Sequence, residues 1–199
     1  MRLVCFLLLG CSRAPQMREY SDAFDRGALG SDWSDTGGNY ALAGGKLVAN
    51  KAYNHPLWLV PRLPRDAEIT FDAWSYSPDG DLKVEAWGDG ESAATNKGAY
   101  TSTGYVFIFG GWKNSRTVLA RMDEHGANRK ERADMRVAVG RKYHWRIARK
   151  GVRLSWWIDD QLVFELDDPE PLEGAGHRHF SFNDWEAELH FDNLRIRAL

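Results

Sequence analysis

This chain has almost no cysteine, no long apolar run and no strong net charge. Its two cysteines, Cys5 and Cys11, both lie near the start, so residues 12–199 contain no internal disulfide. The first apolar stretch, Leu3–Leu9, is far shorter than the roughly 20 residues that a membrane-spanning helix needs. A formal net charge of −2 gives no bulk electrostatic attraction to nucleic acid or to an anionic membrane.

Helical periodicity is also missing. No window of about 11 residues or more keeps a 3.6-residue apolar period together with capping residues. Beyond residue 20 we find no linker, repeat or low-complexity tract. A mainly helical domain and a multidomain chain are therefore both disfavoured.

Short alternating segments are present instead. In Ala67–Trp74 every second side chain is apolar, and Gly104–Gly110 is apolar on both faces, as expected for a central strand. Further strands are expected at 81–87, 116–122, 142–149, 153–158, 161–166 and 187–197. Turn signals separate them, and Asp159-Asp160 predicts a tight hairpin. The sequence predicts an all-β fold: a two-sheet antiparallel β-sandwich, or jelly roll.

Aromatic residues are frequent, with nine Trp, nine Phe and seven Tyr. A sandwich core accommodates many of them, but some are expected at the surface, where flat rings stack on sugars. Charge is uneven: residues 113–153 carry thirteen Lys or Arg against four Asp or Glu. This pattern fits a solvated basic face or a surface for an anionic polysaccharide. Because no nucleic-acid motif accompanies it, we expect no nucleic-acid partner.

The N-terminus resembles the leader of a bacterial lipoprotein. Leu8-Leu-Gly-Cys11 is similar to a lipobox, in which the cysteine thiol receives a lipid. The resemblance implies a signal and short tether at 1–18, a domain at 19–199, and lipidation of Cys11. Ser12 after the cysteine favours the outer membrane of the cell envelope. A misplaced start codon or a cytosolic protein with an apolar N-terminus are the alternatives.

A further resemblance covers residues 20–199. Its motifs, in order, are Phe24 with Trp33, Gly44-Gly-Lys-Leu47, Tyr143-His-Trp-Arg-Ile147, Trp157-Ile-Asp-Asp-Gln-Leu-Val-Phe164, Asp168-Pro-Glu-Pro-Leu172 and Phe191-Asp-Asn-Leu-Arg-Ile196. Together they resemble the concanavalin A-like lectin/glucanase superfamily. The resemblance implies two curved antiparallel sheets whose concave face holds glycans. It specifies the chemistry poorly, since function depends on the site built on the fold.

The first candidate site is on the expected strand 81–87. Asp81, Lys83, Glu85 and Trp87 share one face of it, opposite an apolar face. In glucanase relatives two carboxylates on such a strand form the catalytic pair. Here Lys83 separates the acids, which would lie about 13 Å apart, beyond the spacing of a hydrolase pair. A sugar-binding face beside Trp87 and a solvated face remain the other interpretations.

A second candidate is Arg121-Met-Asp-Glu-His-Gly126, followed by Arg129. Arg121 and Asp123 are candidate contacts to a uronate or a sulfated sugar. Glu124, His125 and Arg129 are the candidate catalytic residues if the protein is a polysaccharide lyase or a glycosidase, with His125 as general base. A surface ion-pair cluster is the alternative.

A third candidate lies before the last strand, where Asn183 and Trp185 are expected at the rim of a ligand site; the alternative is a turn with a packed Trp. Trp112 is a further candidate platform for a sugar ring. No cofactor is certain, but glucanase relatives hold Ca²⁺ with backbone carbonyls and an aspartate. That resemblance implies Asp22, Asp25 and Asp192 as possible ligands of a structural calcium ion.

Three functions follow from these observations. The leading hypothesis is a monomeric, envelope-anchored protein that binds a polysaccharide or another glycan, without catalysis. The alternative is a glycoside hydrolase or polysaccharide lyase acting on an anionic or β-linked polysaccharide. The third is a structural envelope protein that contacts another protein through an aromatic surface.

Overall fold

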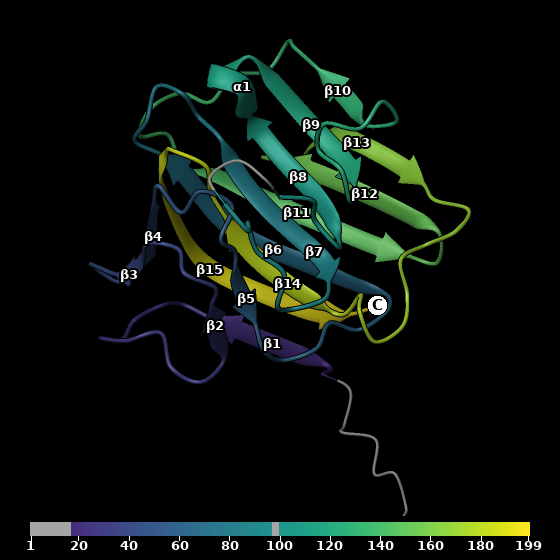
Figure 1. Cartoon of the computed structure of the whole chain (residues 1–199), viewed down its shortest axis with the longest axis horizontal. Helices are drawn as coiled ribbons and strands as arrows, with labels where there is room; N and C mark the ends of the chain where they lie inside the picture. The colour runs from purple at the N-terminus through teal and green to yellow at the C-terminus, as the bar shows by residue number, and fades with distance from the viewer. Residues whose placement is uncertain (1–16, 97–99) are drawn as a thin grey trace, which may run out of the picture.

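The computed structural model describes residues 17–96 and 100–199. Over these residues the chain forms two antiparallel β-sheets that pack face to face, with one short helical turn (Figure 1). The predicted all-β sandwich is therefore confirmed. Within the described ranges no helix has the length and apolar character needed to cross a membrane.

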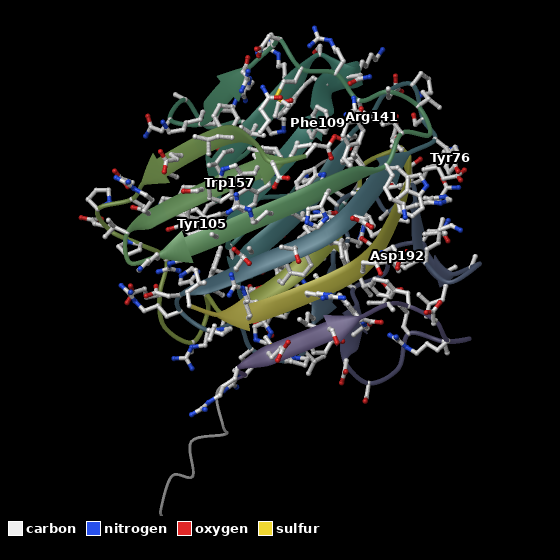
Figure 2. The ribbon with its side chains drawn as sticks, turned by 180° about the vertical axis from the view of Figure 1, so that it is seen from behind. Tyr76, Tyr105, Phe109, Arg141, Trp157 and Asp192 are labelled. Carbon is white, nitrogen blue, oxygen red and sulfur yellow. The ribbon has the colours of Figure 1, made fainter. Side chains whose placement is uncertain are left out.

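One sheet, called sheet A, has the strand order β13-β12-β11-β6-β15-β4-β3, and β1 pairs with the second half of β15. Its strands are β1 (Glu19–Asp22), β3 (Tyr40–Leu42), β4 (Leu47–Asn50), β6 (Ala67–Ser75), β11 (Tyr143–Lys150), β12 (Arg153–Ile158), β13 (Gln161–Asp167) and β15 (Glu188–Ala198). Figure 2 views the molecule from the side of this sheet.

The other sheet, called sheet B, has the order β10-β9-β8-β7-β14-β5-β2. Its strands are β2 (Trp33–Asp35), β5 (Leu57–Leu59), β7 (Leu82–Gly88), β8 (Tyr105–Gly110), β9 (Arg116–Arg121), β10 (Lys130–Arg132) and β14 (His179–Asn183). The helical turn α1 (Gly111–Asn114) follows β8 at the end of this sheet (Figure 1).

The core lies between the sheets and is strongly aromatic. Phe71 on β6 is fully buried, with its ring centroid 5.2 Å from that of Trp145 and 5.6 Å from that of Phe182. The alternation seen in the sequence explains this arrangement, because successive strand residues point to opposite faces. Truncating such a ring to alanine costs about 3–5 kcal/mol, so these contacts fix how the two sheets stack.

The turns follow the predicted pattern. Asp159 and Asp160 connect β12 to β13 with φ angles of 49° and 61°, the left-handed pair of a tight hairpin. The segment α1 differs from an ordinary helix because Trp112 and Lys113 have φ angles of 50° and 58°. The expectation that the domain lacks regular helices thus agrees with the described residues.

Candidate functional site

The outer face of sheet B, which points away from the core, contains a hollow of about 500 Å³. The connections around β7 and the floor of the sheet supply its lining: Asn54, Asp79, Asp81, Lys83, Ile108, Trp112, Lys113, Glu124, His125, Trp185, Glu186 and Ala187. A hollow of this size suits one small-molecule ligand.

A buried lysine forms the floor. Lys83 is only 2% exposed, and its Nζ lies 2.5 Å from Oε2 of Glu124 and 2.6 Å from Oδ1 of Asn54. Burial acts to lower the pKa of Lys83, but the carboxylates of Glu124, Asp81 and Glu85 outweigh it and raise this pKa. The lysine is therefore a fixed cation that orients the carboxylates around it.

Asp81 immediately precedes β7, and its side-chain carboxyl group has an unusual pKa. Its Oδ2 accepts the backbone N–H of Trp185 at 3.2 Å. Burial raises the pKa of Asp81 to about 8, with further increases from Asp184 and Glu124, against the lowering effect of Lys83. At neutral pH this carboxyl group is mostly protonated, so it donates as well as accepts hydrogen bonds.

Two tryptophans form walls on either side of β7. Trp112 comes from α1, between β8 and β9, whereas Trp185 comes from the connection between β14 and β15. The Arg129 guanidinium lies 4.9 Å from the Trp112 ring centroid, and His125 meets that ring edge-on at 5.6 Å. Trp185 packs edge-on against Tyr53 at 5.3 Å. These contacts hold both indoles in place.

Strained backbone surrounds the hollow. Asn54, Asp81, Trp112 and Lys113 all have positive φ angles, between 50° and 63°. For Trp112 and Lys113 this conformation costs roughly 1–2 kcal/mol, whereas Asn and Asp adopt it more readily than other residues with a side chain. Such strain is often retained at binding sites, where it fixes the position of a side chain. Here it positions Trp112 and Lys113, which line the hollow.

Asp184 and its neighbours fix the turn that carries Trp185. The Asp184 carboxylate accepts the backbone N–H groups of Ala52 and Ala187 at 3.1 and 3.0 Å. Burial raises the pKa of Asp184 to about 6, although these hydrogen bonds oppose the increase. No local sequence pattern indicated Asn54 or Tyr53 as site residues, because both come from a turn about 30 residues earlier than Lys83.

The structure brings together six of the predicted site residues at the hollow. They come from four separate segments: Asp81, Lys83, Trp112, Glu124, His125 and Trp185. Arg129 lies next to Trp112, and one of the Arg129 N–H groups donates to the carbonyl oxygen of Glu124 at 2.8 Å. The predicted strand face and the predicted Glu-His segment are thus parts of one site.

Glu85 and Asn183 require a correction, because both are fully buried rather than facing a ligand. The Glu85 carboxylate accepts hydrogen bonds from the hydroxyls of Tyr100 and Ser102 and from the Asn183 amide. Burial raises its pKa in spite of Lys83 and these donors. Glu85 therefore anchors the segment before β8 against the sheet.

The placement of Trp87 on the polar face is wrong. Its ring is 1% exposed, lies in the core beside Tyr105, and donates its indole N–H to the carbonyl oxygen of Pro64 at 3.0 Å. The register of β7 against β14 shifts at this point, and Trp87 has a φ of 56°. A bulge of this kind turns a side chain to the other face of the sheet.

Arg121 and Asp123 also lie away from the hollow. Nε of Arg121 is 3.0 Å from Oδ2 of Asp168, and its guanidinium also donates to the carbonyl oxygen of Glu170. The Asp123 carboxylate accepts the backbone N–H of His125 at 2.8 Å and shapes the turn. The predicted Arg/Asp contact to an anionic sugar therefore does not form part of this site.

Two of the three predicted calcium ligands already have hydrogen-bond partners. The Asp22 carboxylate is already bound by Arg26 and by the indole N–H of Trp33. Asp192 lies on β15, where its side chain accepts the backbone N–H of Asn193, and Asp25 is exposed. Among residues 17–96 and 100–199 no group of three or more His, Cys, Asp or Glu could hold a metal ion. Cys11, the predicted lipidation site, lies outside the described residues.

Comparison with known proteins identifies the fold. No family model matches the chain, and no curated protein matches it in sequence. Among solved structures, the carbohydrate-binding module CBM66 from Bacillus subtilis aligns with 84% of this chain and 96% of its own, at 16% identity and a TM-score of 0.62. A β-1,3-1,4-glucanase (lichenase) derived from a mouse hindgut metagenome aligns over 92% and 100%, at 10% identity and a TM-score of 0.65.

A third similar structure is the carbohydrate recognition domain of Emp46p, which aligns over 85% of this chain and 89% of its own, at 14% identity and a TM-score of 0.61. These structures include binding modules and hydrolases, so their likeness specifies architecture and not activity. The chain therefore has the same two-sheet jelly-roll fold as these structures.

Proposed function

We propose that this protein binds a carbohydrate in the hollow on sheet B. The observation that carries the proposal is the pairing of two aromatic walls, Trp112 and Trp185, with a polar floor built on Lys83. Sugars present flat C–H faces and hydroxyl edges at once. Aromatic rings bind the first by stacking, and fixed polar groups bind the second.

The polar groups suit hydroxyl recognition. Asp81 in its protonated state offers a donor and an acceptor, and Glu124 offers carboxylate oxygens held in place by Lys83. His125 stands at the exposed edge, with its Nε2 3.6 Å from Oε1 of Glu124. A set that contains donors and acceptors fits a ligand whose hydroxyls are both. The binding modules and recognition domains among the similar structures support this proposal.

A glycan array probed with the full chain tests it, using neutral and anionic saccharides. We expect binding to at least one saccharide class, and Trp112→Ala and Trp185→Ala should each weaken it by at least about tenfold, or about 1.4 kcal/mol. Trp157→Ala is the matched control. Trp157 lies on the outer side of sheet A, under Arg146, on the face seen in Figure 2. An array without any hit would contradict the proposal.

A second candidate is glycoside hydrolysis in the same hollow. Burial raises the pKa of Asp81 and favours its protonated form, whereas the Glu124 carboxylate lies against the Lys83 ammonium. A protonated carboxyl group that shares a site with a second carboxyl group is the arrangement that acid–base hydrolysis uses. In this reaction Asp81 would protonate the glycosidic oxygen as its C–O bond breaks. Glu124 would take a proton from the water that attacks the sugar carbon.

Release of reducing ends from a polysaccharide panel tests this candidate, and absorbance of unsaturated products tests a lyase reaction with His125 as base. Hydrolysis lost in Asp81→Asn and Glu124→Gln, but kept in Asp167→Asn, which changes an exposed carboxylate on sheet A, would establish it. Binding without any product would leave the carbohydrate-binding proposal alone.

We also propose that the chain is a monomeric lipoprotein of the cell envelope, attached through Cys11. The proposal rests on Leu8-Leu-Gly-Cys11 in the sequence. Metabolic labelling with a fatty-acid analogue should mark the wild type and not Cys11→Ala, and the delipidated chain should elute as a monomer. Equal labelling of wild type and Cys11→Ala would refute attachment through Cys11. Elution as a dimer would refute the monomeric state.

A further inference from the structure

We infer that the hollow accepts the end of a saccharide chain and not a stretch of its interior. This inference rests on the proposed carbohydrate binding and adds the class of ligand. Its basis is that the chain's own segments close three sides of the hollow. A polysaccharide running straight across the sheet would need two opposite sides open.

The first closed side lies along the strands, toward Glu85. In the pairing of β7 with β8, Lys83 lies opposite Ile108 and Glu85 lies opposite Val106. The hollow lies over the first pair. Over the second pair, Tyr100 and Ser102 donate to the Glu85 carboxylate, and both Glu85 and Val106 are at most 1% exposed. A ligand therefore cannot continue along β7.

The second closed side is made by the connection after β9. Met122 bonds through its N–H to the carbonyl oxygen of Gly104, at the far end of β8. The connection then returns over the sheet, so that Glu124 reaches Lys83 and His125 reaches Trp112. Arg129 fixes the return by donating to the Glu124 carbonyl oxygen. The β9 side of the hollow is thus a wall.

The third closed side lies toward β14 and β5. Trp185 and Tyr53 pack together there, and the turn that contains Asn54 is tied to the segment before β8 by the N–H of Ala94, 2.8 Å from the Asn54 carbonyl oxygen. Behind them, the Trp58 indole N–H donates to the carbonyl oxygen of Ser92. These contacts leave no passage across β14.

The fourth side is the mouth. Asp79, Lys113 and Glu186 line the hollow and are exposed, and they come from the connections at the end of the sheet where β7 begins. A saccharide enters there and must leave there. Hollows of about 300–1,000 Å³ enclose most of one drug-sized ligand, so a volume near 500 Å³ suits a short chain end.

The test is a set of oligosaccharide ladders. The full chain is titrated by calorimetry with cello-, laminari- and manno-oligosaccharides of about one to six rings, together with any class found on the array. We expect the affinity to rise with oligosaccharide length up to about three rings. Longer oligosaccharides should then bind with an affinity within twofold of that of the three-ring ligand. With the corresponding polymer, partial endo-hydrolysis at constant mass should raise the molar binding capacity in proportion to the new ends.

Trp112→Ala supplies the control, because it should weaken every bound length by the same factor and leave the plateau in place. Affinity that keeps rising from three to six rings, or a polymer capacity that follows mass, would overturn the chain-end inference while carbohydrate binding stood. Absence of binding to every ladder and to the array would overturn both.

Discussion

Nζ of Lys83 lies 2.5 Å from Oε2 of Glu124, although Lys83 belongs to β7 and Glu124 to the connection after β9. This buried ion pair fixes the connection across the hollow. Removing one partner of such a pair leaves an uncompensated charge, which typically costs about 3–5 kcal/mol. The pair is therefore the main contact between the floor and the wall of the site.

We expect Glu124→Gln to lower the free energy of unfolding by about 3–5 kcal/mol, because it leaves the Lys83 ammonium buried without its partner. The double variant Lys83→Met, Glu124→Gln should lose less than the sum of the two single variants. Urea denaturation measures all three. As a control, Asp167→Asn breaks an ion pair with Arg153 that is 58% exposed on both sides, and should cost at most about 1 kcal/mol. Strict additivity would argue against the coupling.

Tyr100→Phe removes one hydrogen bond to the buried Glu85 carboxylate. We expect a loss of about 1–3 kcal/mol, together with faster hydrogen exchange in residues 100–104, because that segment loses its anchor. Tyr76→Phe is the matched control, since Tyr76 is 51% exposed. Equal stability of the two variants would show that the Tyr100 hydroxyl does not hold the segment.

The raised pKa of Asp81 predicts a pH dependence. In the folded state this carboxyl group titrates near 8, against 3.8 for its ordinary value, so the folded protein binds one more proton than the unfolded chain between these limits. Its contribution to stability is fully present below pH 3.8 and is lost as pH rises to about 8. Compared with wild type, Asp81→Asn should therefore become relatively more stable as pH rises through this window.

Urea denaturation at several pH values, with Asp79→Asn as the control for an exposed carboxylate, measures this difference. A stability difference between wild type and Asp81→Asn that is independent of pH would contradict the raised pKa.

Substitutions at Lys113 test whether the backbone around the hollow is strained. Its φ of 58° is left-handed, so Lys113→Gly should raise the free energy of unfolding by about 0.5–1 kcal/mol, the relief of strain less the entropy of glycine. Lys113→Ala keeps the strain and should bring no such gain. Thermal denaturation of the pair distinguishes them, and an equal effect of both changes would indicate that the left-handed turn is not strained.

The fold was accessible from the sequence because alternation and turn chemistry act locally. Asp81 and Lys83 were predicted as site residues from strand alternation, and Trp112 and Trp185 as aromatic rings that could stack on a sugar. All four line the hollow. Their function as sugar-binding residues remains a prediction.

Two features of the site were not accessible from local patterns. Trp87 was placed on the wrong face because a bulge in β7 interrupts the alternation of side chains. No residue type in the sequence indicates this bulge. The burial of Glu85 depends on Tyr100 and Ser102, which lie 15 and 17 residues away and reach it only through the fold.

The most direct test of carbohydrate binding in the hollow follows the nine tryptophan side chains of the chain by NMR. The indole N–H resonances are assigned and then followed while the oligosaccharide found on the array is added. We predict that the Trp112 and Trp185 resonances shift with saturation, while that of Trp157, on the outer side of sheet A, stays in place. Saturable shifts at Trp157 with none at Trp112 or Trp185 would contradict it.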